Sequence, residues 1–251
     1  SNVEIDGKDI ILGDLVFRSV SSPDVSRKAI QLYNSFKSSD KDQKSLNKWR
    51  EENIYGYYDK KALSGNYTKK GEIKRFASTE ASPWSSWFLN ICVTEDSAFS
   101  SQINVGRLWV GYPINSKTNS DKLGLFNLKK EVTADPDSFK GQIVWLPFDI
   151  SDGVPVSVGD MISAPRKGGN HMRVFVNSSG TVMGGNEGYH GSKGIGGGMG
   201  RGSVKLDDNG APVPGQSYSG FKYKHILKKV FVVGSVNSLK SDKLTESKRR
   251  L

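Results

Sequence analysis

The sequence predicts an α+β fold in which a central helix packs against an antiparallel sheet. Helical patterns lie mainly in the first half of the chain, and strand-like runs lie mainly in the second half. Many of the 28 glycines fall in one stretch, which favours elaborated loops over a helical bundle. Strands that cluster after a central helix are typical of α+β domains. The length of 251 residues suffices for one large domain or two small ones.

The N-terminal region contains an extended entry followed by two helices. Apolar runs at 10–12 and 15–17 are separated by Gly-Asp and predict a hairpin-like segment. A helical pattern begins at Pro23, since proline is favoured at the first helical position. A second helical stretch covers 45–55. We expect residues 1–80 to form an extension whose helices pack on the core.

The core is predicted over residues 81–235. It opens with a helix after Pro83, whose large apolar residues pack inward. Strand-like runs follow at 105–112 and 143–148, separated by a long polar excursion. We interpret residues 98–153 as an insertion into the core.

The last third of the chain reads as strands and a glycine-rich segment. Runs at 171–176 and 181–183 flank Asn-Ser-Ser-Gly, which predicts a β-hairpin. Residues 187–220 are rich in glycine and predict a loop, and a final strand follows over 221–233. Residues 236–251 are predicted to be a charged tail.

The formal net charge of +10 favours polyanionic partners such as nucleic acid, anionic lipid or an acidic cell wall. Few aromatic residues are interleaved with the charges, so nucleic acid is not the favoured partner. No apolar run reaches the roughly 18 residues that a membrane span needs, and we find no cleavable signal peptide.

Cys92 is the single cysteine, so no internal disulfide can form. Three histidines and one cysteine without close ligand spacing predict no metal site, and no cofactor motif is found. The glycine-rich run at 194–202 lacks the Gly-Lys-Ser/Thr ending of a phosphate-binding loop.

Three residues occur in an order that suits nucleophilic hydrolysis. Ser85 opens a predicted helix, His171 opens a predicted strand, and Asn186 is predicted to end the strand paired with it. A nucleophile at a helix N-terminus gains from the free amide groups there, and a histidine oriented by a polar residue can act as its base. We therefore predict Ser85, His171 and Asn186 as catalytic residues.

Residues 83–92, Pro-Trp-Ser-Ser-Trp-Phe-Leu-Asn-Ile-Cys, resemble the Pro-Trp-Cys-Ala-Ala-Phe segment of papain-like peptidoglycan hydrolases of the NlpC and CHAP type. Gly159-Asp160, residues 170–176 and residues 182–186 resemble three further segments of that family, in the same order. The resemblance implies a papain-like fold and an amidase or endopeptidase acting on peptidoglycan. It covers under a quarter of the chain.

The resemblance places Ser85 at the position of the catalytic cysteine. An engineered Cys→Ser substitution, a natural active serine and a degenerate site that binds without cleaving all stay open, because serine ionises far less readily than cysteine. The alternative function is a catalytically inactive cell-wall-binding or structural module on the same fold. Phage or secretion-device proteins are possible partners, and a virion, periplasmic or extracellular location would fit.

Other residues near these motifs have predicted binding roles. We expect Trp84, Gly184, Gly185 and His190 to contact substrate. Each also has a structural interpretation: tryptophan can fill a core, and glycine can serve a turn. The same holds for the catalytic set, where Ser85 could cap a helix and Asn186 could occupy a turn with positive φ.

Overall fold

The computed structural model describes residues 7–37, 43–57, 85–102, 125–166, 169–190 and 195–249. The helices and helical turns are α1 (Pro23–Lys37), α2 (Gln43–Arg50), η1 (Glu51–Tyr55), α4 (Ser85–Thr94), α5 (Ser97–Gln102), α7 (Leu125–Ala134), η6 (Pro136–Phe139), η7 (Ile150–Asp152) and α8 (Val236–Arg249). The strands are β1 (Ile10–Leu12), β2 (Leu15–Ser19), β3 (Ile143–Asp149), β4 (Met161–Arg166), β5 (Gly169–Phe175), β6 (Thr181–His190), β7 (Ile195–Ser203), β8 (Ser217–Tyr218), β9 (Phe221–Lys222) and β10 (His225–Ser235).

One eight-stranded antiparallel sheet organises the molecule. Its strands run in the order β1–β2–β10–β4–β5–β6–β7, and β3 also pairs with β10. The eleven-residue strand β10 joins the two ends of the sheet, because it pairs with β2, β3 and β4. The combination of helices with an antiparallel sheet confirms the predicted α+β class.

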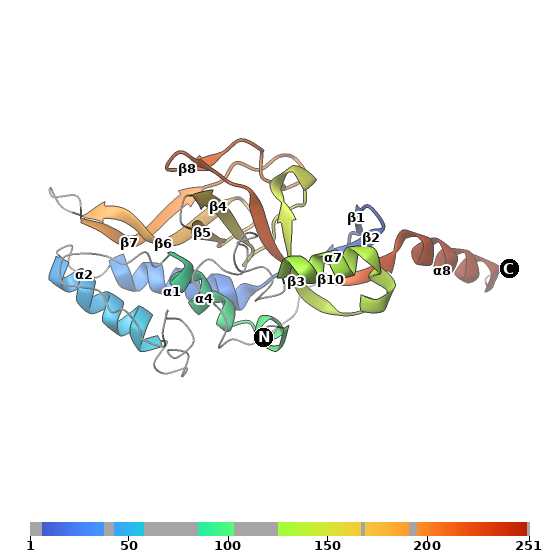
Figure 1. Cartoon of the computed structure of the whole chain (residues 1–251), viewed down its shortest axis with the longest axis horizontal. Coiled ribbons are helices and arrows are strands. Elements are labelled where there is room, and N and C mark those ends of the chain that lie inside the picture. The colour runs from blue at the N-terminus through green and yellow to red at the C-terminus, as the bar shows by residue number, and fades with distance from the viewer. Residues whose placement is uncertain are drawn as a thin grey trace.

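Helices α1 and α4 cover one face of the sheet, and β8 lies on the opposite side (Figure 1). The core between helices and sheet contains side chains from α1, α4 and the sheet, among them Phe88, Cys92, Met172 and Val174. A second core on the other face contains Phe175 with apolar side chains of β4, β6 and β10. Both faces of the sheet are therefore buried around β5.

Helix α1 begins at Pro23, as the sequence predicts. Its buried side chains recur at the spacing of one helical face, with Val25, Ala29, Leu32 and Phe36 all nearly inaccessible to solvent. The entry hairpin is also confirmed, because β1 and β2 pair antiparallel.

The hairpin of β5 and β6 forms where the sequence predicts it. Val174 lies opposite Met183 in the antiparallel ladder. Asn177 Oδ1 accepts hydrogen bonds from the backbone N–H groups of Ser179 and Thr181, and Gly180 has a φ of 100°. The turn is thus built by an Asn side chain and a glycine in a conformation that other residues rarely adopt.

The glycine-rich segment contains strands, which corrects the predicted loop over residues 187–220. Strand β6 continues to His190, and β7 pairs with it along most of its length. At this end of the sheet, the buried guanidinium of Arg50 donates to the carbonyl oxygen of Gly197, with Nη2 at 3.1 Å. Helix α2 is thereby attached to β7.

The predicted charged tail forms helix α8 as far as Arg249. None of its residues is buried, and it projects from the end of the molecule where β1 and β2 lie (Figure 1). The predicted strand at 105–112 and Trp84 fall outside the described residues. In the parts of the chain that the structure describes, no helix has the length and apolar character of a membrane span.

Candidate functional site

Helix α4 covers Ser85–Thr94, so a helix is present where the sequence predicts the central helix. The helix packs across both β5 and β6. Its buried residues Phe88 and Cys92 share a core with Met172 of β5. The face of β5 toward α4 is therefore the face that carries Met172.

His171 lies on the opposite face of the sheet, because successive side chains of a strand alternate. Its ring stacks on Tyr218 of β8, with centroids 4.0 Å apart and planes 9° apart. The ring is 1% exposed. The sheet therefore separates the His171 ring from the described core that α4 forms with Met172.

The residue that contacts His171 is Glu187 rather than Asn186. His171 Nε2 lies 2.5 Å from Glu187 Oε2. The pairing of β6 with β7 shifts between Gly185 and Glu187, so that Asn186 is the extra residue of a β-bulge and has a φ of 58°. Asn186 therefore has a positive φ, as its alternative interpretation as a turn residue expects. The bulge places the side chain of Glu187 on the same face of the sheet as His171.

A buried charged cluster surrounds Glu187. Arg173 Nη2 donates to Glu187 Oε1 at 2.7 Å, and Arg173 Nη1 donates to Tyr223 Oη at 3.2 Å. The guanidinium also lies 4.8 Å from the ring centroid of Tyr218. Burial alone would raise the pKa of Glu187, but the hydrogen bond with His171 and the charge of Arg173 outweigh it and lower that pKa. Glu187 is thus held as a carboxylate.

Glycines make room for this cluster. A Cβ atom at Gly184 or Gly200 would overlap the Glu187 carboxylate, and one at Gly202 would meet the Arg173 guanidinium at 2.7 Å. The glycine-rich composition of β6 and β7 therefore has a packing reason. Gly184, predicted to contact substrate, lies against buried side chains instead.

The other residues predicted to contact substrate are Gly185, His190 and Trp84. Gly185 is buried opposite Met199 in the ladder of β6 and β7. His190 ends β6 opposite Ile195, and the structure describes only its backbone. Trp84 lies outside the described residues.

The Gly-Asp motif is part of the scaffold. Gly159 has a φ of 89°, and a Cβ atom there would overlap the carbonyl group of Ser22. Asp160 Oδ2 forms an ion pair with Lys228 Nζ at 2.8 Å, and both side chains are fully buried. Burial raises the pKa of Asp160 to about 6, although Lys228 opposes the shift. The motif thus joins α1, β4 and β10.

Cys92 and His225 are two further titratable residues, and both are buried. Cys92 is fully buried, and burial raises the pKa of its thiol far above the usual value, so a reactive thiolate is not supported. His225 packs edge-on against Phe126, and burial together with Lys224 lowers its pKa to about 4. Across the described segments, no group of three or more His, Cys, Asp or Glu side chains could hold a metal ion.

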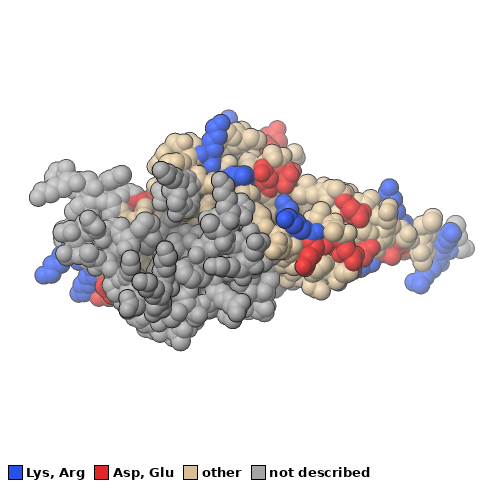
Figure 2. Space-filling model, viewed as in Figure 1, with Lys and Arg blue, Asp and Glu red and all other residues tan. Residues whose placement is uncertain are grey.

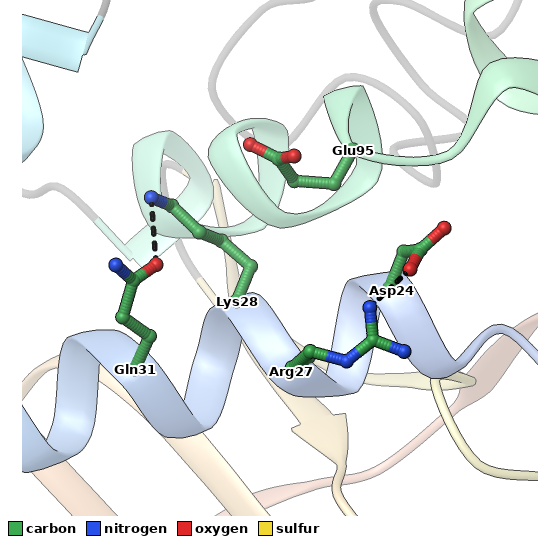
Figure 3. Close-up of a pocket in the computed structure, with 5 residues that line it drawn as sticks. All are labelled: Asp24, Arg27, Lys28, Gln31 and Glu95. Atoms are coloured by element: carbon green, nitrogen blue, oxygen red, sulfur yellow. Dashed lines mark hydrogen bonds and ion pairs between the residues drawn. The ribbon is translucent and has the colours of Figure 1, made fainter. Parts of the chain in front are cut away.

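An open cavity lies on the helical side of the molecule, between α1 and the end of α4 (Figure 3). Its volume is about 410 Å³. Its lining contains two acids, two bases and an amide: Asp24, Glu95, Arg27, Lys28 and Gln31. The sequence analysis missed this site, because the four α1 residues read as the solvated face of an amphipathic helix. Their spacing at i, i+3, i+4 and i+7 could have shown that the four side chains lie together on one face of the helix.

Comparisons with protein-family models, with curated proteins and with solved structures find no match for this chain.

Proposed function

We propose that this chain is a non-catalytic module that binds an acidic cell-wall polymer, on a scaffold of the papain-like type. The observation that carries the proposal is the position of His171. Its ring is enclosed between Tyr218 and Glu187, on the sheet face away from α4. A general base must come within hydrogen-bond reach of the nucleophile. The position of His171 on the face away from α4 therefore argues against a role as general base for Ser85.

Wall binding is favoured over other non-catalytic roles by two further points. The segments around Ser85, Asp160 and Asn186 resemble those of peptidoglycan hydrolases. The net charge of +10 attracts acidic polymers. Lys and Arg side chains are visible on α8 at the far end of the molecule (Figure 2). The exposed residues Lys240, Lys243, Lys248 and Arg249 give that helix an excess over Asp242 and Glu246.

The experiment is sedimentation of the chain with purified sacculi, with a neutral polysaccharide as the control matrix. We expect binding to sacculi that weakens as salt is raised, because exposed charges are screened. Ser85→Ala should bind as well as the wild type. Equal retention on both matrices, or none on sacculi, would contradict wall binding.

A peptidoglycan amidase or endopeptidase is the second candidate, favoured by one observation. Helix α4 covers Ser85–Thr94 and packs across the sheet, and the first amide groups of an α-helix are suited to stabilising an oxyanion. Zymography of Ser85→Cys separates the two functions. No clearing supports the non-catalytic module, whereas clearing that disappears in Ser85→Ala supports the hydrolase.

A further inference from the structure

The cavity between α1 and α4 contains two opposite charges that do not pair with each other. Lys28 comes from α1 and Glu95 directly follows α4, and both side chains extend into the space between the helices (Figure 3). Although both line the same cavity, no ion pair within 4.0 Å joins them among the described residues. Each charge is instead held by a neutral partner.

The neutral partners fix the two charged groups in place. Lys28 Nζ donates to Gln31 Oε1 at 3.1 Å and lies 5.0 Å from the ring centroid of Tyr57. Tyr57 Oη donates to Glu95 Oε1 at 2.8 Å. Burial raises the pKa of Tyr57, so its hydroxyl stays protonated and remains a donor to the carboxylate. The side chain of Tyr57 thus positions both charges.

The remaining charges of the lining neutralise each other. Arg27 Nη1 donates to Asp24 Oδ1 at 2.5 Å, and the Arg27 side chain is 70% exposed. With two acids and two bases, the lining has no net charge, which disfavours a simple anion or cation. A molecule with one charge of each sign would satisfy both Lys28 and Glu95.

We propose that this cavity binds a small zwitterionic peptide, with its carboxylate at Lys28 and its ammonium group at Glu95. The volume of about 410 Å³ lies in the range of small-ligand sites. The inference rests on the proposed wall-binding function, because the peptide stems of peptidoglycan carry free amino and carboxyl groups. It assigns to those stems a site that is separate from the His171 cluster.

Three synthetic peptides test the charge requirement by titration calorimetry on the wild-type chain. The first, Nα-acetyl-lysyl-D-alanyl-D-alanine, has one ammonium group and one carboxylate. The second is its C-terminal amide, which lacks the carboxylate, and the third is acetylated at Nε, which removes the ammonium charge. We expect the first to bind and each of the others to bind about tenfold or more weakly, since a charged hydrogen bond contributes about 1.5–3 kcal/mol.

Variants locate the site. Lys28→Met and Glu95→Gln should each weaken binding of the zwitterionic peptide about tenfold or more, whereas Lys205→Met, at an exposed position elsewhere, should not. Undetectable binding to the wild type, equal binding of the three peptides, or equal affinity in all variants would overturn the proposal. The peptide series decides the question even if a variant fails to fold.

Sacculus sedimentation separates this proposal from the function on which it rests. If sacculi bind but the zwitterionic peptide does not, the cavity proposal fails and wall binding stands. If the peptide binds but sacculi do not, wall binding fails and the cavity keeps its charge selectivity. Loss of both would remove both proposals.

Discussion

Gly200 lies so close to Glu187 that a Cβ atom at position 200 would overlap the carboxylate. That carboxylate cannot move aside easily, because His171 and Arg173 hold it in a buried site. The absence of a side chain at position 200 of β7 is therefore a condition for the buried cluster on β5 and β6.

Gly200→Ala should destabilise the protein by about 1–3 kcal/mol, the usual cost of overpacking a filled interior. Urea denaturation followed by circular dichroism measures the change. Gly7→Ala is the matched control, since nothing lies within 4 Å of the added Cβ there. Equal unfolding midpoints for the two variants would show that Glu187 does not occupy this space.

Glu187→Gln should cost about 3–5 kcal/mol, because it leaves the buried Arg173 guanidinium without a carboxylate. Asn186→Gly should change stability by less than about 1 kcal/mol, since glycine readily adopts the φ of 58° found there. Both values come from chemical denaturation at neutral pH. A larger loss for Asn186→Gly than for Glu187→Gln would assign the partner of His171 to Asn186 instead.

Asp160→Asn should also cost about 3–5 kcal/mol, because Lys228 would remain charged in the interior. The double variant Asp160→Asn/Lys228→Met should recover part of that loss, since no unpaired ion is left. A double-mutant cycle with Lys228→Met alone measures the coupling between the two residues. Additive losses would contradict a direct ion pair.

His225 should make the fold sensitive to acid. Its pKa is lowered from 6.5 to about 4 in the folded protein, so its contribution to stability is present above pH 6.5 and lost as the pH falls through 4. His225→Phe, which can still pack against Phe126, should lose less stability than the wild type between pH 6.5 and 4. Thermal unfolding across this range provides the measurement.

Asp160 acts in the opposite direction within the same pH range. Its pKa rises from 3.8 to about 6, so its contribution is present below pH 3.8 and is lost as the pH rises through 6. The test of His225 is therefore the difference between variant and wild type at each pH. A difference that does not vary with pH would contradict the lowered pKa of His225.

The sequence predicted the elements whose signals are local. Pro23 marks the start of α1, and the Asn-Ser-Ser-Gly turn marks the hairpin of β5 and β6, because both depend on backbone preferences of a few residues. Strand β7 was missed, since a run of glycines has low strand propensity. Its glycines are explained by Glu187 and Arg173, which only the folded sheet brings near.

The neighbours of the His171 side chain could not be predicted from local sequence patterns, for two reasons. Both faces of β5 are buried, so the alternation of His171 with Met172 did not reveal which side faces the helix. The bulge at Asn186 places the Glu187 side chain on the same face of the sheet as His171. A shift of one residue in strand pairing has no clear signal in the sequence. His171 and Arg173 alternate along one face of β5, and this pair was a usable hint that a buried acid lies near them.

The attachment of Arg50 to Gly197 affects how molecules of this protein meet one another. Outer strands tend to recruit strands from neighbouring chains, because their unpaired carbonyl groups accept hydrogen bonds. At β7 the carbonyl oxygen of Gly197 already accepts hydrogen bonds from the Arg50 guanidinium of the same chain. We therefore expect this carbonyl group to be unavailable to a strand from a neighbouring chain.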